Sequence, residues 1–309
     1  MTEIDLSQSL WMLLSFVALG WVAARYLKVD PRPIATLLVY IIAPLTFFRG
    51  LTQGEPSIDK LILTGGVVVL STILCLVVNV VAARFFAEQE RALLAFSAGT
   101  GNTGYFGFPV ALVLLPPEGV TLYLFCMLGI SLYEFTVGFY ISARGRFSIK
   151  ESLIRLAKLP LIYAFLAGML VSALGLHVPD AAAEGLDYFK YCFTVLGMMI
   201  IGMTLGRVTW RSIDGRFVAG CVLVRFLIWP LATLLLVVLL RSSVGISDTL
   251  ALTFLLIGAV PMAANVVVIA MELDIRPEKG AIAVLITTLA APLLIPLYLG
   301  QVLPWVLSL

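Results

Sequence analysis

The residues best suited to bind a ligand lie in two apolar stretches that glycine, asparagine and proline interrupt. The first stretch, 91–115, reads RALLAFSAGTGNTGYFGFPVALVLL, and the second, 249–272, reads TLALTFLLIGAVPMAANVVVIAME. Inside a helix, glycine costs about 1 kcal/mol and proline about 3 kcal/mol relative to alanine. We therefore expect both helices to be broken near their middle.

A broken helix exposes backbone N–H groups and the positive end of a helix dipole, which together attract an anion. We expect Pro109 and Pro261 each to occupy the first position of a second half-helix. The alternative is that the glycines allow close helix packing and the prolines only kink the helices. The residues predicted to bind a substrate are Asn102, Thr103, Gly104, Pro109, Pro261 and Asn265.

Two ionisable residues also lie inside apolar stretches, Glu134 within 119–143 and Arg225 within 217–240. At 1.5 Å per residue, each lies roughly 12–13 Å from one end of its stretch. Ionisable residues at membrane depth are costly and usually functional. We expect the two to approach each other or to share one polar cavity. The alternatives are that Arg225 extends to the surface and that Glu134 makes a structural hydrogen bond to a neighbouring helix.

The residue types that enzymes and metal sites need are scarce. Cys75, Cys126, Cys192 and Cys221 lie in apolar runs without CxxC spacing, and His177 is the sole histidine. An intramembrane enzyme would need paired carboxylates, a Ser–His pair or a histidine cluster. We therefore expect no catalytic residue, no metal and no cofactor, with buried cysteines and a histidine in a loop.

The composition excludes most soluble classes. Of 309 residues, 61% are hydrophobic and 12% are charged, whereas a soluble domain has about 45–50% and about 25%. The net charge of +2 is too small to indicate a nucleic-acid partner. The sequence therefore predicts an all-α integral membrane protein.

The apolar stretches are long enough to cross a membrane as helices, which takes about 20 residues. They are continuously apolar rather than alternating, which excludes a β-barrel. Ten are expected: 8–25, 33–51, 61–83, 91–115, 119–143, 159–178, 187–206, 217–240, 249–272 and 280–306.

The distribution of cations predicts the orientation. Fifteen of the 20 Lys and Arg residues lie at the connections that follow odd-numbered stretches. Such connections face the cytoplasm, so we expect a multi-pass protein of the cytoplasmic (inner) membrane with both termini outside. Residues 1–8 carry no cation, so the first stretch is not expected to be a cleaved signal peptide.

The two halves of the chain indicate an inverted repeat. The segment FVALGWVAARYLKV from Phe16 aligns without gaps with FLAGMLVSALGLHV from Phe165, and the same offset pairs the two broken stretches. Because each half, 1–155 and 156–309, holds five stretches, the second must be inverted relative to the first. Inverted repeats with paired broken helices are typical of secondary transporters, with the substrate near the midplane.

With these motifs, the chain resembles the auxin efflux carrier family, whose bacterial members include malonate and other organic-anion permeases. The likeness lies in GNTGYFGFPVA, VPMAANVVVIA, TTLAAPLLIP and the Pro44 of IIAPLTFF. It departs from the family at Leu273, where an aromatic residue is frequent, and at Gly197, where a proline would match Pro44.

The resemblance implies ten helices in two inverted repeats, a fold shared with bile-acid and sodium/proton transporters. Helices 1, 2, 6 and 7 would form a scaffold, and helices 3–5 and 8–10 a core that moves like an elevator, with helices 4 and 9 crossing at the substrate. The expected substrate is a small auxin-like or malonate-like carboxylate.

We further expect coupling to protons through Glu134, and a homodimer in the lipid bilayer. The alternative is a sodium-coupled symporter of the same fold that carries a bile-acid-like or other organic anion. Sodium sites use several carbonyl and carboxylate oxygens, and the absence of an acid from the two broken segments counts against sodium.

Overall fold

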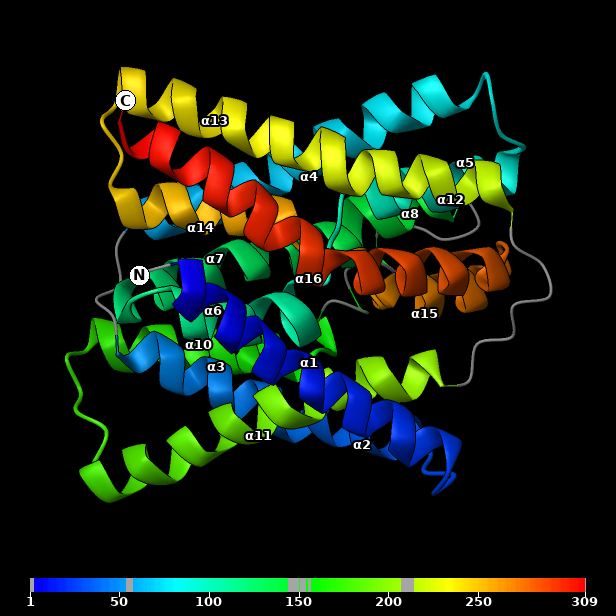
Figure 1. The fold of residues 1–309 in the computed structure, drawn as a ribbon. Helices are drawn as coiled ribbons and strands as arrows, with labels where there is room; N and C mark the ends of the chain where they lie inside the picture. Colours follow the sequence, from blue (N-terminus) through cyan, green and yellow to red (C-terminus); the bar gives the residue numbers. More distant parts are fainter. Residues whose placement is uncertain are drawn as a thin grey trace.

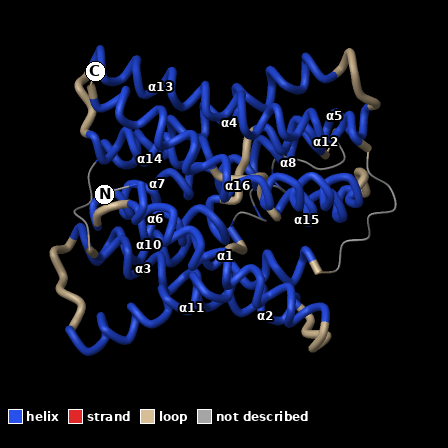
Figure 2. The backbone as a smooth tube through the Cα atoms, in the orientation of Figure 1, coloured by secondary structure: helices blue, strands red, loops and turns tan. Residues whose placement is uncertain are grey.

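The computed structural model describes residues 3–53, 58–143, 150, 154, 157–206 and 214–308, in which the ordered elements are helices and no strand occurs (Figure 2). This confirms the all-α prediction for the described part of the chain. The described helical stretches that are long and apolar enough to cross a membrane are Pro31–Thr52, Asp59–Ala82, Pro117–Ser142, Asp180–Leu205, Gly215–Ser243 and Pro277–Leu307. Ten membrane crossings remain a prediction.

The helices overlap every range expected from the sequence. The first half contains α1 (Glu3–Arg25), α2 (Pro31–Leu37), the π-helical turn η1 (Leu38–Ile42), α3 (Ala43–Thr52), α4 (Ile58–Ala82), α5 (Glu88–Ala98), η2 (Thr103–Gly107), α6 (Phe108–Leu114), α7 (Pro117–Tyr133), η3 (Glu134–Gly138) and α8 (Phe139–Ser142). The second half contains α10 (Pro160–Ala173), α11 (Asp180–Leu205), α12 (Gly215–Leu223), η5 (Val224–Ile228), α13 (Trp229–Ser243), α14 (Asp248–Ala259), α15 (Asn265–Leu273) and α16 (Pro277–Leu307).

Three helix ends differ from the expected bounds by five residues or more, and the first is the start of α1, which lies at Glu3 rather than at 8. Helix α10 ends at Ala173 rather than at 178, because Gly175 adopts the left-handed conformation (φ +62°) that terminates helices. Helix α11 begins at Asp180 rather than at 187, because its first turns are polar and hydropathy does not detect them.

The helices form two groups in space (Figure 1). In the first group, α1 packs along α11 and α3 packs along α10. In the second, α4 packs against α5 and α7, α13 against α14, and α16 against α12 and α15. We name each group after two of its helices: the first is the α1–α11 group and the second is the α4–α16 group. The segments η2, α6, α7, η3 and α8 belong to the second group. The contact between α1 and α11 is close enough that a Cβ atom on Gly202 would lie 1.8 Å from the carbonyl oxygen of Val17.

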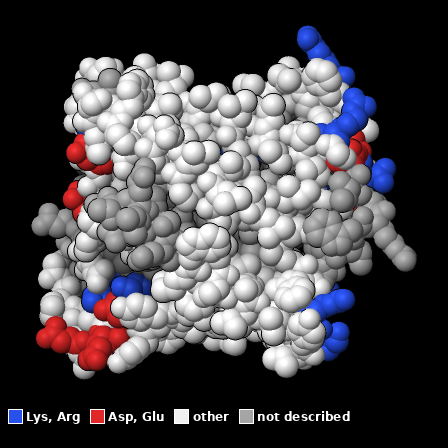
Figure 3. Space-filling view, in the orientation of Figure 1, with Lys and Arg blue, Asp and Glu red and all other residues white. Residues whose placement is uncertain are grey.

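The turns gather at two opposite ends. Turns 26–30, 83–87 and 274–276 lie at one end, whereas both chain ends and turns 174–179 and 244–247 lie at the other (Figure 1). Figure 3 shows charged side chains near both ends and an uncharged band between them, with Lys and Arg more abundant at the first end, which we call the cation-rich end. This arrangement suits a chain whose middle is surrounded by lipid.

Three cysteines, Cys75, Cys126 and Cys221, are buried as expected. Cys192 is exposed, so the prediction of burial was wrong for this residue. It lies on an exposed side of α11, which an apolar sequence context cannot distinguish from a buried one. His177 lies in the turn 174–179, as predicted, and its side chain contacts Asp180 at 3.3 Å.

Candidate functional site

The two interrupted segments meet in the middle of the molecule. Helix α5 ends at Ala98 and helical backbone resumes at Thr103, while α14 ends at Ala259 and α15 begins at Asn265. The backbone N–H of Asn102 donates to the carbonyl oxygen of Pro261 at 2.7 Å, which joins the two non-helical stretches directly. Both predicted interruptions are therefore present, and Figure 2 shows non-helical backbone at this central position.

The prolines do not start the second half-helices as predicted. Asn102 caps the first of these with its side-chain oxygen, which accepts from the N–H of Phe106 at 3.3 Å, so helical backbone begins at Thr103. Pro109 follows inside that continuous helical segment, as the second residue of α6. Pro261 lies in the non-helical stretch before α15, where its carbonyl group bonds Asn102. Side-chain capping and the contact between the two segments decide the helix starts here.

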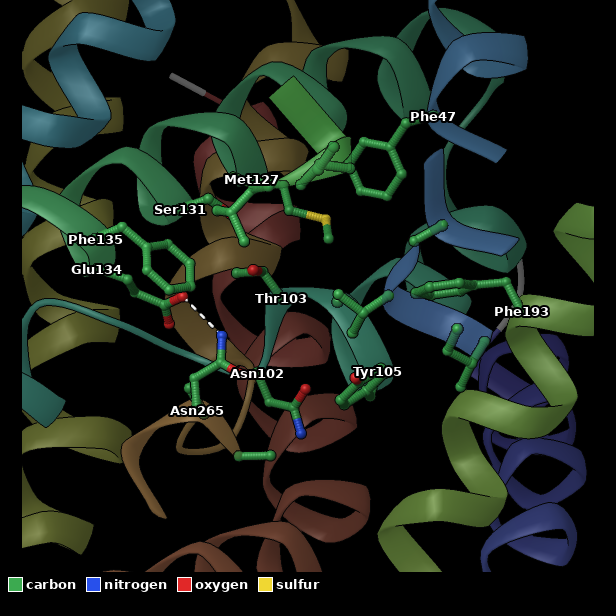
Figure 4. A pocket seen from close by; sticks show the side chains of 18 of the residues that line it. Phe47, Asn102, Thr103, Tyr105, Met127, Ser131, Glu134, Phe135, Phe193 and Asn265 are labelled. Atoms are coloured by element: carbon green, nitrogen blue, oxygen red, sulfur yellow. Dashed lines mark hydrogen bonds between the residues drawn. The ribbon is translucent and has the colours of Figure 1, made fainter. Parts of the chain in front are cut away.

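A cavity of about 150 Å³ opens beside the junction, and we call it the crossing cavity. Figure 4 shows Phe47 and Phe193 on the side of it opposite Glu134 and Asn265. The predicted residues Asn102, Thr103, Gly104, Glu134 and Asn265 line this cavity together with Tyr105 and Ser131. Pro109 and Pro261 are not among its lining residues.

A second cavity of about 260 Å³ lies between α2 and α11 on one side and α15 and α16 on the other. We call it the cation-side cavity, because Arg32 lines it near the cation-rich end. Asn102, Tyr105, Ala264 and Asn265 line both cavities, so the two cavities adjoin at these residues. Among the described residues, neither Nδ2 of Asn102 nor Oγ1 of Thr288, both buried, has a hydrogen-bond partner. The cation-side cavity therefore has two unused polar groups in a mostly aliphatic wall.

Glu134 is the first residue of η3 and is 3% exposed. The hydroxyl of Thr100 donates to its Oε1, and Nδ2 of Asn265 donates to its Oε2 at 2.9 Å (Figure 4). Glu134 therefore makes the hydrogen bonds to neighbouring segments that the alternative reading expected, and it also lines the crossing cavity.

Arg225 lies within η5 and is 2% exposed, so the alternative that it extends to the surface is wrong. Its guanidinium group donates to backbone carbonyl oxygens of both broken segments and lies 4.7 Å from the centre of the Trp229 ring. The acceptors are Thr100 (3.1 Å), Ile257 (2.7 Å), Gly258 (3.4 Å) and Val260.

The two buried charges approach each other at Thr100. The hydroxyl of Thr100 donates to Glu134, and its carbonyl group accepts from Arg225. Within the described part of the chain, Glu134 and Arg225 form no direct ion pair with each other. Thr100, Tyr105 and Thr288 are not among the site residues predicted from the sequence. Thr100 and Tyr105 flank the selected asparagine in the same glycine-rich segment, which was the available signal.

Within the described residues, no group of three His, Cys, Asp or Glu side chains is arranged to hold a metal ion. The site therefore offers amide, hydroxyl and backbone groups, one carboxyl group and a guanidinium group that is already engaged. Such a set can bind a small polar ligand without forming a covalent bond to it.

Two comparisons with known proteins relate this chain to membrane transporters. An uncharacterized transporter of Methanocaldococcus jannaschii is 27% identical over 179 residues, which cover 55% of this chain and 58% of that protein. The match thus spans less than two thirds of the relative's length. The membrane transport protein family matches residues 5–299, almost the whole chain. The chain therefore belongs to this family of membrane transport proteins, the auxin efflux carrier family that its motifs resemble.

Proposed function

We propose that this protein is a secondary transporter that moves a small organic anion across the cytoplasmic membrane. The observation that carries the proposal is the buried Nδ2 of Asn102, which has no hydrogen-bond partner among the described residues and belongs to a side chain lining both cavities. A buried donor left unpaired costs about 1–3 kcal/mol. A carboxylate oxygen bound there would remove that cost, so the donor favours an anionic ligand.

The backbone beside Asn102 supports the same ligand class. Helical segments begin at Thr103 and at Asn265, and both residues line the crossing cavity. The N–H groups and the positive dipole end at a helix start favour negative charge. We propose Asn102, Thr103, Gly104 and Asn265 as the substrate-binding residues, with Pro109 and Pro261 supporting the backbone.

We propose that the fold consists of ten transmembrane helices in two inverted repeats, 1–155 and 156–309, with both termini outside. The direction of the helices supports this, because α1 and α10, the first helices of the two halves, run in opposite directions (Figure 1). The excess of cations at the end opposite the chain termini supports the orientation.

We propose an elevator-like movement of the α4–α16 group against the α1–α11 group. Both cavities lie on the border between these groups, where ligands bind preferentially. The crossing cavity has Phe47 and Phe193 from the first group and Glu134 and Asn265 from the second. Proton coupling through Glu134 and a homodimer complete the proposal.

Uptake by vesicles containing the purified protein tests this function. Labelled malonate, labelled indole-3-acetate and an uncharged control are offered under imposed proton, sodium or voltage gradients. We expect at least one carboxylate to accumulate and the uncharged control to be excluded. Transport of neither carboxylate, or equal transport of the uncharged control, would contradict the proposal.

Asn102→Ala tests the site, with Asn79→Ala as its matched control. Asn79 lies in α4 and lines neither cavity. We expect Asn102→Ala to fold but to lose the thermal stabilisation that the transported carboxylate gives, whereas Asn79→Ala keeps it. Equal stabilisation of the two variants would remove Asn102 from the site.

A further inference from the structure

Carbonyl groups at the C-terminal ends of α5 and α14 point to the same place. The last carbonyl groups of a helix lack partners within the helix, and they carry the negative end of its dipole. In transporters with broken helices, carbonyl groups of this kind coordinate the coupling cation. In this protein they belong to Thr100, after α5, and to Ile257, Gly258 and Val260 at the end of α14.

The guanidinium group of Arg225 already occupies this place. Its three nitrogens donate to the four carbonyl oxygens, two of them at 2.7 and 3.1 Å, and the group is closed off from solvent. The ring of Trp229 lies 4.7 Å from its central carbon, and Nε1 of Trp229 donates to the carbonyl oxygen of Ala98 at 2.7 Å. Backbone carbonyls and an aromatic face are both groups that stabilise a cation.

The space around the guanidinium group is full. A Cβ atom on Gly101 would lie 2.7 Å from Cζ and from Nη2 of Arg225, so the backbone approaches the cation as closely as glycine allows. The nearby acidic group is Glu134, which accepts from the hydroxyl of the same threonine. The site thus contains the oxygen ligands of a cation site together with a covalently attached cation.

We propose that Arg225 is a built-in cation that takes the place of a bound metal ion between the ends of α5 and α14, and that transport therefore does not require Na⁺. This inference rests on the proposed function for its transport readout, but the assignment of Arg225 can be tested on the protein alone. It favours the anion transporter over the sodium-coupled symporter.

The first experiment replaces Na⁺ by choline at constant ionic strength. We expect the thermal midpoint of the purified protein and the rate of carboxylate uptake to be unchanged. A midpoint or an uptake rate that rises with Na⁺ would overturn the inference while leaving anion transport intact. If no carboxylate is transported, the proposed function fails, and the thermal measurement still decides the role of Arg225.

The second experiment compares Arg225→Ala with Arg225→Lys in the full chain. We expect Arg225→Ala to lower the thermal midpoint and added methylguanidinium to restore it, whereas urea, which is planar but uncharged, does not. Restoration by urea to the same extent would overturn the inference, because hydrogen bonding without charge would then suffice. If Arg225→Ala does not fold, Arg225→Lys decides: its midpoint should be independent of Na⁺, and dependence on Na⁺ would overturn the inference.

Discussion

Glu134 and Arg225 are both almost fully buried, yet their hydrogen-bond partners differ in kind. Burying a charge is costly unless the group is hydrogen-bonded or paired. Arg225 donates hydrogen bonds to four backbone carbonyl oxygens. Its surroundings therefore change only if the broken segments separate. Glu134 meets two side chains, and one of them, Asn265, also lines both cavities. A ligand that engages Asn265 would therefore alter the environment of Glu134 rather than that of Arg225.

Glu134→Gln tests proton coupling at the residue scale. Glutamine has nearly the same shape but cannot release a proton at its side chain. We expect the variant to exchange substrate across vesicles without a gradient, while its uptake no longer responds to an imposed pH gradient. Uptake measured over a range of external pH checks this.

Glu184→Gln is the control for that substitution, since Glu184 lies on the exposed part of α11 and its carboxylate accepts from Tyr188 at 3.4 Å. It should keep the pH profile of the unchanged protein. An unchanged profile in Glu134→Gln as well would show that Glu134 is only structural.

At the scale of elements, the closest helix contact is the one between α1 and α11. A Cβ atom on Gly20 would lie 2.0 Å from the carbonyl oxygen of Met199, and one on Gly202 would lie 1.8 Å from that of Val17. Because backbone faces backbone here, a side chain cannot rotate away to make room. The two helices therefore form a tight pair within the α1–α11 group.

Gly202→Ala should destabilise the protein by about 1–3 kcal/mol, the usual cost of overpacking. Gly185→Ala in the same helix is the matched control, because a Cβ atom there meets nothing within 4 Å. The control should be neutral or gain up to about 1 kcal/mol from helix propensity. Thermal denaturation in detergent measures both, and equal midpoints would contradict the close contact.

Asp214 joins two elements at the cation-rich end. Its carboxylate caps α12 by accepting from the N–H groups of Arg216 and Phe217, both at 3.1 Å, and it binds Nζ of Lys279 in α16 at 2.5 Å. The hydrogen bonds from Lys279 and Phe217 hold the pKa of this carboxyl below its usual range. Its stabilising effect is therefore present at neutral pH and is lost as the pH falls through that lowered pKa.

Asp214→Ala should lower the free energy of unfolding at neutral pH by about 1 kcal/mol for the lost cap, with at most about 1 kcal/mol more for the partly exposed ion pair. Asp214→Asn keeps the cap and should lose only the smaller ion-pair part. Thermal midpoints of both variants check this, and the deficit of Asp214→Ala should shrink in acid. Equal losses in both variants would show that the cap contributes nothing.

The π-helical turns are elements that hydropathy did not predict. Among the described residues, three of these turns interrupt long, mostly apolar helices: η1 precedes Pro44, η5 precedes Pro230, and η3 begins at Glu134. A proline lacks the N–H for the regular helical bond, which favours a widened turn just before it. No proline follows η3 closely, and its first residue, Glu134, contacts both broken segments.

At the scale of the whole molecule, the candidate site lies on the border between the two helix groups. The side chain of Tyr105 lies on this border, lines both cavities and stacks on Phe193 with ring centres 6.3 Å apart. A Cβ atom on Gly197 in α11 would lie 3.6 Å from the Cα of Tyr105. If one group slides past the other, this pair of positions must separate.

A disulfide across the border should therefore stop transport. We expect Tyr105→Cys combined with Gly197→Cys, with Cys192 replaced by alanine, to lose uptake on oxidation and to regain it on reduction. The control is Ala24→Cys with Gly206→Cys, whose Cβ atoms would lie 3.2 Å apart within the α1–α11 group. Uptake that survives the cross-border disulfide would contradict relative movement of the groups.

The sequence by itself determined the helices, most of their ends, the two breaks and the excess of cations at one end. These features depend on local composition, since backbone in lipid must bond within its own helix and glycine and proline prevent that. Tertiary structure alone decided that Asn102 and Asn265 line two cavities and that Thr100 hydrogen-bonds both Glu134 and Arg225. It also decided that Arg225 faces carbonyl groups instead of the surface. Arg225 and Thr100 are 125 residues apart, so their contact depends on how two distant helices face each other. A pattern of residues along one helix cannot specify that.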